Sequence, residues 1–371
     1  MMSAKPDGAR HCLVFRDKLL LPSEGFIPTH YRGFDRLQPV YVANRFGWRA
    51  DELDGPKLAT GRGPIGQFLF KQTGHVDLGP MRAFDPVAMH AHFGRGGALA
   101  LPLARQLGLP LYVTYHGGDA TKNTHQRRRL IPTIYQRRLA ALQHYARAFL
   151  CVSDFVAQRL ADQGFPRDKL VTHYIGIDCS RLEAPQPRNG PLLFAGRLTG
   201  KKGVDVLLAA MRRLQAAGHV VPRLDIAGAG PDETLLRAAA DGLGTVRFLG
   251  WQTPDALAGL MARATAVVVP SREAADGDCE GLPTVVLEAI RAGAPVIATR
   301  HAGIPEIITH EVSGLLAPEN DADALAALLR QAIDNPARLP SFVSAAQRRL
   351  TADFDAETQS RRLQQILLGH S

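Results

Sequence analysis

Short runs of consecutive apolar residues alternate along the chain with longer stretches in which apolar residues recur every three or four positions. The runs are typical of strands buried on both faces of a parallel sheet, and the longer stretches are typical of helices packed on such a sheet. Residues 204–216 show the helical spacing clearly. The expected strands are 11–15, 39–43, 86–89, 110–115, 148–153 and 170–174 in the first half, and 192–195, 223–227, 245–249, 266–269 and 295–298 in the second.

Two successive sets of alternating strands and helices predict an α/β fold with two Rossmann-like, doubly wound domains. We expect an N-terminal domain over 1–180 and a C-terminal domain over 190–352, with 185–191 as the linker. A final helix over 353–368 should return to the first domain, so that 353–371 belongs to it. Residues 50–80 are rich in glycine, proline and charge, and predict an irregular segment with at most one helix.

The strand, loop and helix expected over 266–294 carry the clearest chemical pattern. The apolar run 266–269 ends at Pro270, a polar loop follows, and a helix should begin at Pro283 or Thr284, because proline suits a first helical turn. Almost every residue of this helix is apolar, so it should be buried. Glu288 lies on it, and a carboxylate there needs hydrogen-bond donors.

A second carboxylate, Glu280, lies in the loop just before the helix. The backbone N–H groups available within 281–284 point outward at the positive end of the helix dipole, which makes this an anion site. Sugar hydroxyls donate to carboxylates and phosphate oxygens accept from amides, so the combination suits a nucleotide sugar. Arg197 and Lys202, at another strand–loop–helix junction, suit its diphosphate, although a surface ion pair is the alternative.

These segments resemble a known family. The phrase EGLPTVVLEA (280–289), the Gly-Arg-Leu of 196–198 with Lys202-Gly203, and His116-Gly117-Gly118-Asp119 after a buried strand are similar to motifs of the retaining glycosyltransferases of family 4. Residues 23–27 resemble the first loop of exopolysaccharide-type, group 1 members, with Glu24 as a base, an acceptor contact or a solvated residue. The resemblance implies the GT-B fold, with two Rossmann-like domains facing across a cleft.

The resemblance also implies roles for individual residues. The catalytic set it implies is His116, Glu280, Arg197 and Lys202. Donor binding is expected at Arg197, Lys202, Gly228, Leu249, Gly281, Leu282, Pro283, Thr284 and Glu288. The implied reaction is retaining transfer of a hexose from a UDP-sugar or GDP-mannose to an acceptor hydroxyl, on a saccharide or lipid-linked saccharide of cell-surface polysaccharide biosynthesis.

We expect no metal in this reaction, because cationic side chains and a helix dipole already face the diphosphate. Asp276 and Asp278 match the Asp-x-Asp of metal-dependent transferases of another fold, but they precede a complete donor signature and are interpreted as a solvated loop. His90 and His92 could bind a metal, yet no third ligand is near in sequence. They are interpreted as the end of a strand.

The composition of the chain indicates which classes of binding partner are favoured. The chain has 371 residues, 46% hydrophobic and 21% charged, four cysteines without metal-type spacing, and a net charge of +9, which favours an anionic partner. The basic excess is concentrated in 120–153, an amphipathic stretch without acidic residues. Docking on an anionic membrane and an ordinary solvated helix face both remain open.

No apolar run approaches the roughly 20 residues of a membrane-spanning helix, and no secretion signal is evident at the start. We therefore expect a cytoplasmic protein, with peripheral contact at the cytoplasmic membrane face as the open addition, and no nucleic-acid partner. A non-catalytic GT-B scaffold that binds nucleotide sugars is the alternative function. An NAD-linked enzyme is disfavoured, because Gly228-Ala229-Gly230-Pro231 lacks the dinucleotide fingerprint.

Overall fold

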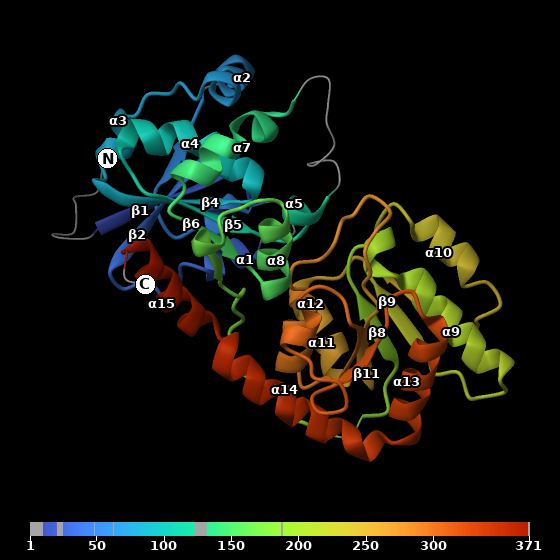
Figure 1. Cartoon of the computed structure of the whole chain (residues 1–371). Helices are drawn as coiled ribbons and strands as arrows, with labels where there is room; N and C mark the ends of the chain where they lie inside the picture. The colour runs from blue at the N-terminus through green and yellow to red at the C-terminus, as the bar shows by residue number, and fades with distance from the viewer. Residues whose placement is uncertain are drawn as a thin grey trace. The chain divides into compact units, whose positions relative to one another are not determined.

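The structure is a computed structural model, and it describes residues 10–20, 25–47, 49–61, 63–122, 132–186 and 188–369. The chain divides into two compact units (Figure 1). Unit 1 comprises residues 1–176 and 356–371, and unit 2 comprises Ile177–Asp355. Each unit is built around one parallel sheet.

Unit 1 contains a seven-stranded sheet in the order β3-β2-β1-β4-β5-β6-β7. All of its paired strands run parallel. The strands are β1 (Arg10–Leu19), β2 (Leu37–Phe46), β3 (Lys57–Ala59), β4 (Pro86–His92), β5 (Leu111–Tyr115), β6 (Ala148–Cys151) and β7 (Leu170–Thr172). The order reverses between β1 and β4, which makes their carboxyl ends the usual place for a ligand in a doubly wound sheet.

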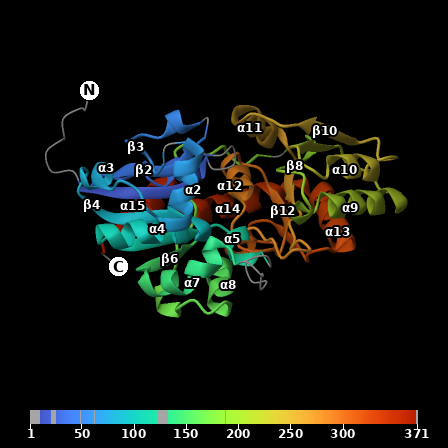
Figure 2. The ribbon, with the colours of Figure 1, turned by 90° about the horizontal axis from the view of Figure 1, so that it is seen from above.

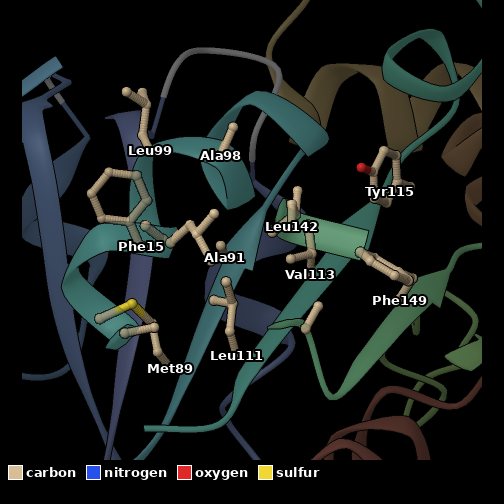
Figure 3. Packing of buried hydrophobic residues seen from close by; sticks show 14 of the residues in the cluster. Phe15, Met89, Ala91, Ala98, Leu99, Leu111, Val113, Tyr115, Leu142 and Phe149 are labelled. Atoms are coloured by element: carbon tan, nitrogen blue, oxygen red, sulfur yellow. The ribbon is translucent and has the colours of Figure 1, made fainter. Parts of the chain in front are cut away.

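Helices cover both faces of this sheet. They are α1 (Phe26–Thr29), η1 (Ala50–Glu52), α2 (Gly63–Thr73), α3 (Gly79–Arg82), α4 (Gly94–Leu107), α5 (Gly118–Thr121), α7 (Ile134–Tyr145), α8 (Asp154–Asp162), η2 (Arg167–Lys169) and α15 (Ala356–Leu367). Figure 3 shows one face, where Leu99 of α4 and Leu142 of α7 pack with Phe15 and Val113 of the sheet. On the other face, Leu363 and Leu367 of α15 are buried.

Unit 2 contains a six-stranded parallel sheet in the order β10-β9-β8-β11-β12-β13. Its strands are β8 (Leu192–Ala195), β9 (Leu224–Ala227), β10 (Val246–Gly250), β11 (Ala266–Val269), β12 (Val296–Thr299) and β13 (Leu315–Ala317). Its helices are η3 (Gly200–Lys202), α9 (Val204–Ala216), α10 (Glu233–Ala239), α11 (Pro254–Arg263), α12 (Thr284–Arg291), η4 (Ile304–Glu306), α13 (Ala322–Asp334), η5 (Pro336–Arg338) and α14 (Leu339–Asp353). Side chains of α9 and α13 share one core with the sheet, and these helices appear together in Figure 2.

All of the expected strands are present, and the differences are two short edge strands that were not expected and the lengths of several other strands. The sequence pattern missed β3 and β13, which are only three residues long and therefore too short to show a period. Strands β1 and β2 are about twice as long as expected, and β4 runs on to His92. The segment 50–80 holds a full helix, α2, as well as β3.

The boundary between the units differs from the expected linker. Residues 188–191 of that linker are not a free spacer, because the Arg188 guanidinium donates to the carbonyls of Met261 and Ala292, both in unit 2. A Cβ on Gly190 would lie 2.0 Å from the Arg263 carbonyl oxygen, so the backbone is packed closely there as well. The chain enters unit 2 at Ile177 and leaves it after Asp355.

Candidate active site

The candidate site in unit 2 lies where the sheet order reverses. Strand β8 has β9 on one side and β11 on the other, so the loops that follow β8 and β11 diverge and leave room for a ligand at the carboxyl ends of the strands. Arg197 and Lys202 belong to the first loop and Glu280 to the second. The topology therefore brings together residues about 80 positions apart in the sequence.

Two glycines allow these loops to approach one another. Gly203 has φ +65°, and a Cβ there would lie 1.9 Å from the Pro270 carbonyl oxygen. Gly228, after β9, has φ +145°, and a Cβ there would lie 1.8 Å from the Gly196 carbonyl oxygen. Side chains are excluded at both positions, because the backbones of neighbouring loops are in contact.

The centre of the site is an ion-pair cluster around Glu280. Its Oε1 lies 3.1 Å from the Lys202 Nζ and 3.3 Å from the Lys201 Nζ. Lys201 also lies 3.3 Å from Asp278. The sequence predicted Lys202 and Glu280 but missed Lys201, whose only signal was its position beside Lys202.

The cluster holds Glu280 in its ionised form. Burial by itself would raise the pKa of the Glu280 carboxyl, but the two ammonium groups outweigh burial and hold the pKa at about 2. Burial would likewise lower the pKa of Lys201, and Glu280 and Asp278 raise it instead. A fixed carboxylate flanked by two cations can accept hydrogen bonds from hydroxyls while the cations attract phosphate oxygens.

Helix α12 starts beside this cluster. It begins at Thr284 after Pro283, with no side-chain cap and no acidic residue in its first turn. Its first amides are therefore suited to an anion. Gly281, Leu282 and Pro283 are buried where the loop enters the helix.

Glu288 lies one turn further along α12. Burial raises the pKa of its carboxyl, while Arg291, a hydrogen bond with Thr284 and the charge of Lys202 oppose the rise. A hydrogen-bond donor of the kind expected for this carboxylate, Thr284, is thus on its own helix. Glu288 and Glu280 both lie close enough to Lys202 to be influenced by its charge.

His301, which follows β12, holds the Glu280 loop in place by a hydrogen bond. The Glu280 amide donates to His301 Nε2 at 3.2 Å, and His301 Nδ1 lies 2.7 Å from Glu319 Oε1. Because an amide can only donate, Nε2 must accept, and the ring proton on Nδ1 points to the carboxylate. His301 is buried and is a positioning residue in this arrangement. The role of Glu319 was not evident from the sequence.

The remaining predicted donor residues lie at the neighbouring strand ends. Arg197 is exposed directly after β8. The Gly228 amide donates to the Gly250 carbonyl at 2.7 Å, which places Gly228 next to the end of β10, where Leu249 lies.

Asp276 is exposed, in keeping with a solvated loop. Asp278 is not, because its side chain is ion-paired with Lys201 and mostly buried.

In unit 1, His116 directly follows β5, and Asp119 fixes its loop. One carboxylate oxygen of Asp119 accepts from the His116 amide at 2.8 Å, and the other accepts from the Gly94 amide at 3.0 Å. The loops after β4 and β5 are therefore joined. Burial raises the pKa of the Asp119 carboxyl, and these amides counteract the rise.

His116 belongs to a cluster of histidines, which are His30, His90, His92, His116 and His173. His90 and His92 are buried on β4, and Tyr31 Oη lies 2.7 Å from a ring nitrogen of each. The two histidines form the end of β4, as the sequence indicated, although the strand runs three residues beyond the expected Met89 and His116 lies beside His92. Across the described part of the chain, however, no group of three or more histidine, cysteine or acidic residues has the arrangement of a metal site.

Other sequence predictions concern the surface of unit 1. Glu24 and Arg127, Arg128 and Arg129 lie outside the described residues. Arg137 and Arg138 on α7 donate to Gln72 on α2, and Ile134, Tyr135 and Leu142 are buried.

No helix among the described residues is long and apolar enough to cross a membrane. A cavity of about 490 Å³ lies near the amino ends of β5 and β6, away from His116.

Solved structures identify the fold to which this arrangement belongs. The crystal structure of Anabaena HepE in complex with UDP-glucose superposes with a TM-score of 0.76 at 18% identity, covering 97% of this chain and 99% of that one. Sucrose-phosphate synthase from Thermosynechococcus elongatus gives 0.75 at 18% identity, covering 98% and 100%. The fold is the GT-B fold of glycosyltransferases.

Sequence comparison then gives the family. The model described as "Glycosyltransferase Family 4" matches residues 77–181, and "Glycosyl transferases group 1" matches 185–349. Escherichia coli (strain K12) WcaL, whose name refers to colanic acid biosynthesis, is 33% identical over 290 residues, 75% of this chain and 69% of that protein. The amylovoran biosynthesis glycosyltransferase AmsK of Erwinia amylovora is 34% identical over 286 residues, 74% and 68%. The chain belongs to the group 1 glycosyltransferases of family 4.

Proposed function

We propose that this glycosyltransferase moves a hexose, with retention of anomeric configuration, from a UDP-sugar or GDP-mannose to a hydroxyl of a saccharide or lipid-linked saccharide. The observation that carries this proposal is the Lys201–Glu280–Lys202 cluster beside the uncapped start of α12. It combines fixed positive charge for a diphosphate with a carboxylate for sugar hydroxyls. The names of WcaL and AmsK support an acceptor in exopolysaccharide biosynthesis.

The main barrier in such a transfer is the departure of the diphosphate from an electron-poor anomeric carbon. The bond from C1 to the phosphate oxygen breaks, its electron pair leaves with the diphosphate, and the acceptor oxygen bonds to C1 on the same face. The acceptor proton passes to the departing phosphate oxygen. Lys202, Lys201, Arg197 and the first amides of α12 stabilise the charge that develops on the phosphates.

Carboxylates orient the donor in this proposal. Glu280, held ionised by the two lysines, accepts from hydroxyls of the transferred sugar, and Glu288 accepts from the ribose hydroxyls. His116 lines the reacting face. Gly228 and Leu249, at the ends of β9 and β10, contact the base of the nucleotide in this proposal. Because cationic groups already face the diphosphate, the proposed reaction needs no divalent cation.

The test is turnover with defined donors. Purified protein is incubated with UDP-glucose, UDP-galactose or GDP-mannose and with short oligosaccharides, and release of the nucleoside diphosphate is measured. One donor should give acceptor-dependent release, and NMR of the product should show the anomeric configuration of that donor. Inverted product would exclude retention. Donor binding without turnover on any acceptor would favour the scaffold alternative.

We also propose that unit 1 contacts an anionic membrane surface, through α2 and α7. Ile65, Phe68 and Leu69 on α2 are 77%, 61% and 51% exposed, and their spacing places them on one side of the helix. Arg137 and Arg138 bind to the end of α2, and α7 carries no acidic residue. An exposed apolar stripe next to cations fits the interface of an anionic bilayer.

A further inference from the structure

Arg272, in the loop after β11, is bonded to three other parts of unit 2. Its guanidinium donates to the Gly200 carbonyl at 2.8 Å, to Asn320 Oδ1 at 3.0 Å and to Asp205 Oδ2 at 2.9 Å. The Arg272 amide also donates to the Lys201 carbonyl at 2.8 Å. Arg272 therefore fixes two successive carbonyls of η3, the turn that carries both lysines of the candidate site.

The side chain of Arg272 is anchored to protein rather than directed at a ligand. Each of its three nitrogens donates to a protein oxygen, its charge is paired with Asp205, and the side chain is only 23% exposed. The ammonium groups of Lys201 and Lys202, in contrast, lie at the Glu280 carboxylate. Any effect of Arg272 on a bound diphosphate should therefore pass through these lysines.

The turn after β13 is bonded to both sides of the candidate site. Glu319, next to the asparagine that binds Arg272, has one oxygen 2.7 Å from His301 Nδ1. Its other oxygen accepts from the Glu273 amide at 2.8 Å. His301 accepts in turn from the Glu280 amide. Adjacent side chains of one turn are thus bonded to Arg272 and, through His301, to Glu280.

This turn is itself held by the fold. Asn320 has φ +58°, a left-handed conformation that asparagine tolerates better than most residues. The next residue, Asp321, is the N-cap of α13 and accepts from the Ala324 amide at 2.8 Å. Helix α13 is packed into the core of unit 2, so the turn is a fixed support for the loops attached to it.

A fixed support matters because the ion-pair cluster places like charges close together. Lys201 and Lys202 both lie within 3.3 Å of the same Glu280 oxygen, and their two ammonium groups repel each other. Long lysine side chains keep such an arrangement only if the backbone that carries them is held. Charged groups stabilise a developing charge best when they are in place before the reaction.

We propose that Arg272 and Glu319 are positioning residues that hold the lysine turn η3 and Glu280 at a fixed spacing for a bound diphosphate. They act on the phosphates through the ammonium groups of Lys201 and Lys202. The use of this spacing by a diphosphate rests on the proposed function, whereas the attachment of the loops does not.

Hydrogen exchange tests the attachment of the loops without a ligand. Arg272→Ala should speed amide exchange in 198–203. Glu319→Gln should speed it around Glu280, because a glutamine has one acceptor oxygen and cannot accept from both His301 and the Glu273 amide.

A milder variant guards against misfolding in this experiment. Asn320→Gly keeps the left-handed backbone and removes only the side-chain contact with Arg272, so it should also speed exchange in 198–203. Wild-type exchange rates in all three variants would overturn the proposal.

Isothermal titration tests the use of the spacing by a diphosphate, with UDP, uridine, GDP and guanosine as probes. For the base that wild type binds, Arg272→Ala and Glu319→Gln should weaken the nucleoside diphosphate about tenfold, the effect of roughly one hydrogen bond. The affinity for the nucleoside, which has no phosphate, should be unchanged. A general loss of structure would weaken both ligands together and would contradict a specific role at the phosphates.

Two further variants separate positioning from simple charge. Arg272→Lys keeps the charge but lacks the planar fork that reaches three oxygens, so it should bind the diphosphate as weakly as Arg272→Ala. Full recovery in Arg272→Lys would overturn the positioning role. Arg212→Ala is the matched control, because Arg212 on α9 donates to the carbonyls of Ala239 and Asp241 elsewhere in unit 2, and it should bind both ligands normally.

The two experiments also separate this proposal from the proposed function. If wild type binds neither UDP nor GDP, the donor assignment is refuted, while faster exchange in the variants still establishes the attachment of the loops. If wild type binds a nucleoside diphosphate and the variants bind it equally well, the donor assignment stands and the positioning role is refuted.

Discussion

Lys202 is the residue on which the charge balance of the candidate site depends most. It lies 3.1 Å from Glu280, and its charge also acts on the half-buried Glu288. We expect Lys202→Ala to lower kcat/KM by about 10²–10³, the usual loss when one preorganised group is removed from a developing charge. Steady-state release of nucleoside diphosphate measures this, with Arg330→Ala, an exposed ion-pair partner on α13, as the control. A change within threefold would remove Lys202 from the diphosphate site.

The ion pairs of Glu280 make the stability of the folded protein depend on pH in the acidic range. Its folded-state pKa of about 2 lies below the ordinary value of 4.5, so its contribution is fully present above pH 4.5 and is lost as the pH falls toward 2. Glu280→Gln removes this carboxylate from both lysines at every pH, although Lys201 keeps its ion pair with Asp278. Urea unfolding should therefore show a stability difference from wild type that is largest at neutral pH and narrows between pH 4.5 and 2. A difference that is constant with pH would contradict the ion-pair assignment.

At the scale of elements, α2 stands out among the described helices, since it buries Phe70 but exposes three large apolar side chains, Ile65, Phe68 and Leu69. We expect Ile65→Ser, Phe68→Ser and Leu69→Ser together to lower binding to phosphatidylglycerol-containing vesicles about tenfold, because insertion of apolar side chains drives interfacial binding. Sedimentation with vesicles at low and high salt measures this. Binding of the wild type should also weaken in high salt, where the arginines of α7 are screened.

The control for this experiment uses exposed apolar residues elsewhere. Val220, Leu235 and Val312 in unit 2 are similarly exposed, and changing all three to Ser should leave vesicle binding unchanged. Arg127, Arg128 and Arg129 changed to Ser form a third variant, which tests the basic stretch that the sequence singled out. Equal sedimentation of all variants would assign α2 and α7 to an ordinary surface and favour a soluble acceptor.

At the scale of the whole molecule, the open question is whether a divalent cation takes part in transfer. Lysines and the start of α12 supply positive charge at the candidate diphosphate site, so activity should persist in EDTA at more than half of its untreated rate. Assays with EDTA, then with added Mn²⁺ or Mg²⁺, measure this. If activity were lost in EDTA and restored by Mn²⁺, Asp276 and Asp278 would become the candidate metal ligands.

The shift in the melting temperature of the whole protein shows which nucleotide sugar it binds. A ligand that binds only the native state raises the melting temperature according to its occupancy. Screening UDP-, GDP-, ADP- and TDP-sugars should identify one base that stabilises the protein, and the corresponding nucleoside diphosphate should retain much of the effect. Because the kinetic tests require the right donor, this screen precedes them.

Much of the fold was determined by the sequence alone. Apolar runs such as 266–269 and 192–195 predict buried parallel strands because a strand covered on both faces has no polar position. The start of α12 was predictable as well, since proline and the apolar run after it act within a few residues. Short edge strands were missed, because three residues carry no period.

The partners of the polar residues were decided only by the tertiary structure. Lys201 meets Glu280, and His301 meets Glu319, because strand order places the loops after β8, β11, β12 and β13 side by side. Tyr31 reaches His90 and His92 across 59 and 61 residues of sequence. The period at which apolar residues recur indicates which positions of a helix or strand are buried. This signal is local, because it depends only on residues a few positions apart. Which buried polar groups satisfy one another depends on the order and register of strands, and no local pattern contains that information.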